Sequence, residues 1–127
     1  MPETEKRKFT RHDSLFLLDY IVVDKEGNQG VYSMGRTLDV CVDGIKLEVL
    51  TPLKVGTLLT ITVGFENELI ELVGEVTHTE FRGGRYVSGV AFYKISKKGR
   101  IIFAKYSEAF LQRKKELEKS GGTIDPQ

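Results

Sequence analysis

Alternation of apolar and polar residues is the feature that most constrains the fold of this 127-residue chain. Ile45, Leu47 and Val49 alternate with Lys46 and Glu48, which is typical of a strand with one face in a core and the other in water. Similar patterns or high β-branched content predict further strands in residues 14–23, 31–40, 59–65, 70–76 and 86–95. The sequence therefore predicts six strands before residue 96.

Short turns separate the predicted strands. The strongest hairpin signal is Arg82-Gly83-Gly84-Arg85, because two glycines accept the positive φ angles of a tight turn. Six consecutive strands joined in this way favour an antiparallel barrel or sandwich over βαβ units. Closure into a barrel would also remove exposed strand edges. We therefore predict an all-β fold, a six-stranded antiparallel β-barrel.

A helix is predicted after the strands. Ser96 is suited to cap its N-terminus, and Ile102, Tyr106 and Phe110 recur at the spacing of one helical face. We expect this stripe to cover an open end of the barrel or a partner chain, and a core role is the favoured one. Lys114 and neighbouring cations are placed to complement the helix C-terminal dipole. The predicted organisation is a flexible arginine-containing arm (1–13), the barrel (14–95), the C-terminal helix (96–119) and a tail (120–127).

Composition narrows the functional classes. The chain has 19 Lys+Arg against 18 Asp+Glu, a balance that disfavours binding to long nucleic acid. Its one cysteine, Cys41, excludes an intramolecular disulfide. No apolar stretch approaches the length that membrane insertion requires, and no secretion signal precedes the strands, so we expect a cytoplasmic protein. His12 and His78 are too scattered to indicate a metal site, and no nucleophile–base set indicates an enzyme or a cofactor.

Two short motifs could bind an anion. Arg7 and Arg11 lie four residues apart near the N-terminus, and residues 39–44 read DVCVDG. A guanidinium can clamp phosphate or bond the O6 and N7 atoms of guanine, and a carboxylate complements the donor edge of guanine. Each motif alone also has an ordinary interpretation, because basic arms are commonly solvated and aspartates form turns. We assign Asp39 to ligand contact and Asp43 to a turn.

Taken in this order and spacing, the motifs resemble those of the PilZ domain, the bacterial receptor family for cyclic di-GMP. The family has R-x-x-x-R followed by [D/N]-x-S-x-x-G, which Arg7, Arg11, Asp39 and Gly44 match, and Cys41 stands at the serine position. A third stretch, G-V-x-F, is matched by residues 89–92, so that the resemblance covers roughly residues 5–111. The resemblance implies a barrel in which Arg7 and Arg11 contact the base and phosphate of the ligand and Asp39 contacts the edge of guanine. It also implies that Gly44 lets the backbone approach the ligand closely.

The resemblance implies a cyclic di-GMP receptor or adaptor that changes conformation on binding and regulates an unidentified downstream protein. Motility and biofilm control are the processes expected of the family, and we expect a monomer or weak dimer. The alternative is a degenerate PilZ-like domain that does not bind the nucleotide and serves as a protein-interaction module, for which Cys41 is the best support. A barrel that binds single-stranded nucleic acid is disfavoured by the near-zero net charge.

Overall fold

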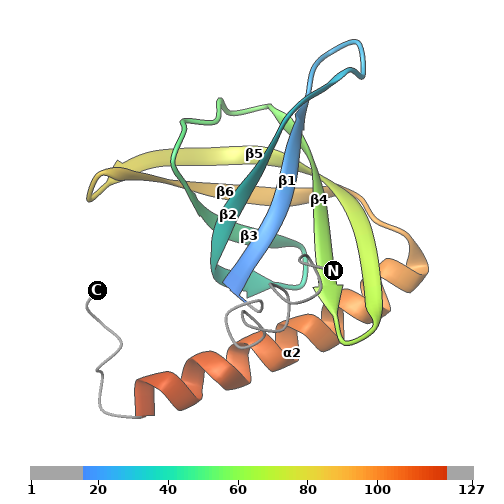
Figure 1. Ribbon diagram of the computed structural model, residues 1–127, viewed down its shortest axis with the longest axis vertical. Helices are drawn as coiled ribbons and strands as arrows, with labels where there is room; N and C mark the ends of the chain where they lie inside the picture. Colours follow the sequence, from blue (N-terminus) through green and yellow to red (C-terminus); the bar gives the residue numbers. More distant parts are fainter. Residues whose placement is uncertain (1–15, 120–127) are drawn as a thin grey trace, which may run out of the picture.

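The computed structural model describes residues 16–119 and contains six antiparallel strands in one closed barrel, in the order β1-β2-β3-β6-β5-β4 (Figure 1). The elements are β1 (Leu17–Val23), β2 (Gln29–Cys41), β3 (Gly44–Val49), β4 (Leu58–Phe65), β5 (Glu68–Arg82), β6 (Arg85–Lys94) and the helix α2 (Lys97–Lys119). The predicted all-β barrel followed by a helix is therefore confirmed. The predicted hairpin at Gly83 and Gly84 is also present, and both glycines have positive φ angles.

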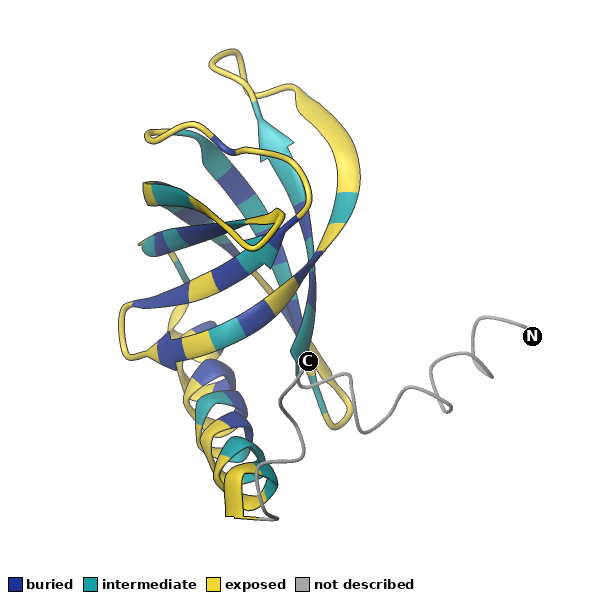
Figure 2. Ribbon diagram, turned by 90° about the vertical axis from the view of Figure 1, so that its left-hand side faces the viewer, coloured by how far each residue is buried: buried dark blue, intermediate teal, exposed yellow. Residues whose placement is uncertain are grey.

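The barrel interior is built by the alternation that the sequence displays. In β4, Leu59, Ile61 and Val63 are fully buried, whereas Thr60 and Thr62 are half-buried on the outer face. Figure 2 shows the same alternation of buried and exposed residues along several strands. Burying one such aliphatic side chain contributes about 1.5–3 kcal/mol, so that the core strongly specifies which face of each strand points inward.

The helix α2 closes one end of the barrel. Its start is fixed by Ser96, whose side-chain oxygen accepts a hydrogen bond from the backbone N–H of Gly99 at 2.9 Å. The predicted stripe of Ile102, Tyr106 and Phe110 is buried against the strands, which confirms its core role. Figure 1 shows α2 crossing beneath the barrel at the end where β1 begins and where β2 turns into β3.

A buried hydrogen bond ties the helix to β2. The hydroxyl groups of Thr37 and Tyr106 lie 3.2 Å apart, and both side chains are inaccessible to solvent. The buried location raises the pKa of Tyr106 to about 12, because the interior disfavours the phenolate. This bond fixes the position of α2 next to the last residues of β2.

The strand β2 extends beyond the core. Its residues 36–41 pair with β3 on one side, whereas its residues 29–35 pair with β1 and, within the described part of the chain, have no partner on the other side. Figure 2 shows the first four residues of β2 as a continuous exposed stretch beside the β1–β2 turn. Within residues 16–119, the closed barrel therefore leaves this half of β2 with a strand partner on one side only.

Candidate functional site

Three residues of the predicted site meet at the corner between β2 and β3. β2 ends at Cys41, a two-residue turn follows, and Gly44 opens β3 directly opposite Cys41. Asp39, Cys41 and Gly44 line one groove of about 330 Å³ on the barrel surface. The other two predicted residues, Arg7 and Arg11, lie outside the described residues. The structure thus brings the D-x-C-x-x-G residues together in one groove.

Gly44 is required by the packing of the corner itself. A Cβ atom at this position would lie 2.4 Å from the backbone oxygen of Val90 on the neighbouring strand β6. The preceding turn is held against β6 by a 2.8 Å hydrogen bond from the N–H of Phe92 to the backbone oxygen of Asp43. Glycine at position 44 therefore lets the corner dock on β6, and Asp43 lies in the turn as predicted. The corner becomes a rigid wall of the groove.

The carboxylate of Asp39 is accessible at the groove. Its Oδ1 atom accepts a 2.9 Å hydrogen bond from the backbone N–H of Val40 and lies 3.9 Å from Nζ of Lys114. An ion pair at that distance between partly exposed groups is weak. Among the described residues, no group donates a hydrogen bond to Oδ2, so this oxygen remains an available acceptor. Asp39 can therefore accept hydrogen bonds from a ligand.

Cys41 is exposed and contacts two grooves. It lines the groove of Asp39 and also a larger groove of about 520 Å³ beneath α2, where Val42, Phe103 and Leu111 contribute side chains. On its residue type alone Cys41 would be expected to be buried, and that expectation is wrong here. The thiol therefore belongs to the walls of both grooves.

Two cations lie near the site that were not assigned to it from the sequence. Lys46 on β3 lies opposite both Asp39 and Gly89 in the strand pairing and lines the same groove. Lys114 on α2 donates a 3.0 Å hydrogen bond to the backbone oxygen of Leu38, so it contacts β2 and does more than complement the helix dipole. The alternation around Lys46 does mark its exposed face, but no local signal in the sequence pairs Lys114 with β2.

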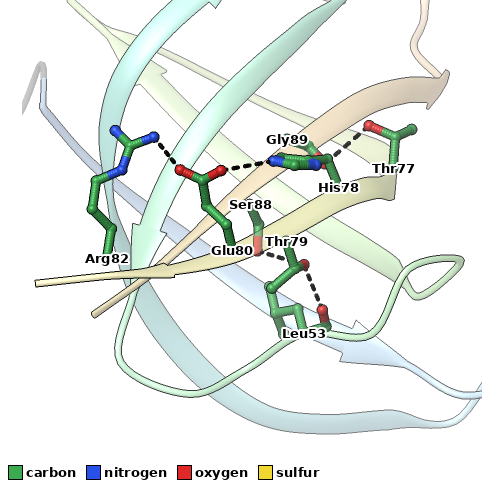
Figure 3. Close-up of polar contacts among 8 residues, drawn as sticks. All are labelled: Leu53, Thr77, His78, Thr79, Glu80, Arg82, Ser88 and Gly89. Atoms are coloured by element: carbon green, nitrogen blue, oxygen red, sulfur yellow. Dashed lines mark hydrogen bonds and ion pairs between the residues drawn. The ribbon is translucent and has the colours of Figure 1, made fainter. Parts of the chain in front are cut away.

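The far wall of the groove belongs to β5 and β6. Thr77 and Gly89 line it, and the hydroxyl of Thr77 donates a 3.3 Å hydrogen bond to the backbone oxygen of Gly89 (Figure 3). Gly89 is the first residue of the G-V-x-F stretch, and its lack of a side chain leaves the wall open above Lys46. Two of the three motif regions thus meet in one groove.

An exposed charge cluster lies further along β5. Glu80 interacts with both His78 and Arg82, and these hydrogen bonds lower the pKa of Glu80 (Figure 3). The side chains of His78 and Arg82 are both exposed. Within residues 16–119 no three His, Cys, Asp or Glu side chains are arranged to hold a metal ion. The one described helix is too polar to cross a membrane.

The described chain is thus a six-stranded barrel with a helix at one end and a surface groove at the β2–β3 corner. The model of the PilZ domain family matches residues 5–109, and the chain belongs to this family of ligand-binding receptor domains. No curated protein matches the sequence.

Two solved structures support the fold. The PilZ domain of YcgR from Escherichia coli, determined with c-di-GMP, is 10% identical with a TM-score of 0.54, and the match covers 84% of this chain and 89% of that one. The apo structure of MrkH from K. pneumonia is 14% identical with a TM-score of 0.55, covering 78% of this chain. The present chain spans about half of MrkH, 48% of its length. At these identities the likeness shows the fold.

Proposed function

We propose that this domain is a cyclic di-GMP receptor that regulates a partner protein. The single observation that carries the proposal is the shared groove of Asp39, Cys41 and Gly44, the residues that match the second motif of the PilZ family. The cyclic di-GMP in the YcgR structure supports the ligand class for a chain of the same family. In this proposal the ligand is sensed and not turned over, and the domain acts as a cytoplasmic receptor.

The groove offers complementary groups for a guanine nucleotide. The available Oδ2 of Asp39 can accept from the N1 and N2 donors of guanine, because a carboxylate is purely an acceptor. Lys46 supplies a cation on the same wall, where a phosphate would be attracted. The missing side chains of Gly44 and Gly89 leave room for a planar base against the backbone.

The described contacts also bring the N-terminal side of the chain toward this groove. Phe16, the first described residue, packs on Phe110 with ring centroids 5.2 Å apart. Phe110 lies beneath Nζ of Lys114, which in turn is 3.9 Å from Asp39. Arg11 precedes Phe16 by five residues, a span of at most about 17 Å of extended chain. Arg7 and Arg11 are therefore proposed to clamp the ligand against the groove.

Clamping would change the surface around α2 and β1. In the proposal, the two arginines leave their ligand-free positions and close on the nucleotide, so that a partner protein meets a different surface in the two states. Cys41 belongs both to this groove and to the larger groove beneath α2. A ligand at Cys41 would therefore alter a wall that the two grooves share.

The second candidate function is a PilZ domain that no longer binds the nucleotide and acts as a protein-interaction module. The observation that favours it is the exposed thiol of Cys41 at the serine position of the motif. A thiol is a weak hydrogen-bond donor and larger than a hydroxyl. Both candidates share the fold and differ at this one groove.

Calorimetric titration with cyclic di-GMP tests the proposal. Wild type is expected to bind, and an Arg7→Ala/Arg11→Ala variant is expected to lose at least about 100-fold in affinity, because each charge-assisted hydrogen bond contributes about 1.5–3 kcal/mol. Arg82→Ala/Arg85→Ala is the matched control, since it removes two exposed arginines at the β5–β6 hairpin. Absence of heat from wild type at high micromolar ligand would contradict the proposal.

A further inference from the structure

Within residues 16–119, the half of β2 formed by residues 29–35 presents an edge without the usual protection against pairing. Residues 29–35 span about 23 Å of extended chain and contain no proline and no charged side chain. Natural proteins normally protect such edges with lysine, proline or a covering segment, because free N–H and C=O groups recruit other strands. By contrast, the tip of the β5–β6 hairpin carries Glu80, Arg82 and Arg85. The two hairpins therefore differ in how their edges are protected.

Apolar side chains flank the edge on both faces of the strand. Val31 is 79% exposed, Tyr32 is 60% exposed and Met34 is 58% exposed. Tyr32 is already ordered, because its hydroxyl donates a 2.6 Å hydrogen bond to Oδ2 of Asp19 on β1. Covering this ring would bury its apolar surface without leaving the hydroxyl unsatisfied. The backbone edge of residues 29–35 can therefore pair with another strand.

The charges at the two ends of the edge select the direction of the incoming strand. One end borders the β1–β2 turn, where the exposed Asp24, Lys25 and Glu26 carry −1, +1 and −1, a net charge of −1, and the other end is the cationic Arg36 on β2. In an antiparallel pair centred on Val31, Arg36 of one copy would lie beside Glu26 of the other. The same arrangement places neutral residues opposite neutral residues along the whole edge. A second copy of this chain thus complements the edge in both hydrogen bonding and charge.

We propose that residues 29–35 of β2 form a homodimer interface, in which two copies pair their β2 edges antiparallel about a two-fold axis near Val31. The pairing is isologous, so each contact occurs twice and the assembly closes at two chains. The two barrels would share one continuous sheet, with the β2–β3 grooves at the ends away from the interface. This dimer does not depend on nucleotide binding.

Sedimentation equilibrium of the full chain over a roughly hundredfold concentration range tests the interface. Wild type should rise from 14.3 kDa toward twice that mass, and Val31→Lys should stay monomeric, because two lysines would face each other at the axis. Val55→Lys, at a residue 66% exposed between β3 and β4, is the matched control and should behave as wild type. A monomeric wild type, a dimeric Val31→Lys or a monomeric Val55→Lys would overturn the proposal.

Charge reversal tests the direction of pairing. Glu26→Arg and Arg36→Glu should each weaken the dimer, and the double variant should restore it, because the double exchange regenerates opposite charges across the axis. Additive weakening in the double variant would overturn the antiparallel arrangement. All measurements are made without nucleotide, so their failure would leave the receptor proposal intact.

Discussion

The two halves of strand β2 have the same backbone conformation but different surroundings. Residues 36–41 pair with β3, place Thr37 and Val40 in the barrel interior, and end at the groove of Asp39 and Cys41. Residues 29–35 pair with β1 alone among the described residues, and their first four members are all exposed. The first half is tied to α2 through Thr37, whereas the second forms an edge beside β1, which in turn pairs with β4.

In the two proposals, the two halves of β2 have different functions. A site that must hold a ligand benefits from a rigid wall, which the buried Thr37–Tyr106 bond and the contact of Gly44 with β6 provide. An interface that pairs by backbone hydrogen bonds needs an accessible edge, which residues 29–35 offer. We expect substitutions in the first half to affect stability and ligand binding, and those in the second half to affect association.

The largest expected effect is on stability at the paired half. Gly44→Ala should lower the free energy of unfolding by about 3 kcal/mol, because the new methyl group would lie 2.4 Å from the backbone oxygen of Val90. Gly30→Ala is the matched change within residues 29–35, where the new methyl group would lie 3.3 Å from the backbone oxygen of Val22. At that separation a shift of a few tenths of an ångström relieves the contact, and the expected change is below about 1 kcal/mol. Urea unfolding measures both, and equal losses would contradict the comparison.

The next effect is the pH dependence of the anchor between β2 and α2. The pKa of Tyr106 is raised to about 12 in the folded protein, above its ordinary value of 10.0. The folded state therefore keeps its proton at higher pH than the unfolded state, and stability is full below pH 10 and falls between pH 10 and 12. The loss attributable to Tyr106 is about 2–3 kcal/mol.

Urea unfolding across this pH range compares wild type with Tyr106→Phe. The variant should be less stable at neutral pH by about 1–2 kcal/mol, because Thr37 loses its buried partner. It should also show a smaller decline from pH 10 to 12 than wild type, since it lacks the group that titrates. Parallel curves for the two proteins would show that Tyr106 is not protected from ionisation.

The smallest expected effect concerns the thiol in the groove. Cys41→Ser should leave cyclic di-GMP affinity unchanged or tighten it several-fold, because one hydrogen bond contributes about 1 kcal/mol. Cys41→Ala is the control that removes the sulfur without adding a hydroxyl, and it should show no such gain. Calorimetric titration of both variants distinguishes the receptor from the non-binding module. A non-binding module should give no heat of binding with serine or alanine at position 41.

Local pattern was sufficient for most of the fold. Alternation around Ile61 and the capping residue Ser96 are short-range signals, and the structure confirms the strand and the helix start that they predict. The pairing of Lys114 with Leu38 joins residues 76 positions apart, and no periodicity encodes such a contact. The edge at residues 29–35 of β2 was not predicted either, because it depends on the relative lengths of paired strands, and β3 is shorter than β2.

The residues of the candidate site could be predicted from their motif, but their arrangement on the surface could not. Asp39, Cys41 and Gly44 were selected by their spacing, and they do line one groove. The packing role of Gly44 and the position of Lys46 across from Asp39 required the register of β3 against β2 and β6. Register is set by long-range pairing, which a single sequence does not display.

Amide chemical-shift mapping with cyclic di-GMP tests the central claim most directly, because it reads both halves of β2 in one experiment. On titration with cyclic di-GMP, we expect shifts in the amide signals of Asp39, Cys41, Gly44, Lys46 and Gly89. The signals of residues 29–34 should not move. An unchanged spectrum, or shifts concentrated in residues 29–34 with none at the β2–β3 corner, would contradict the assignment of the ligand site.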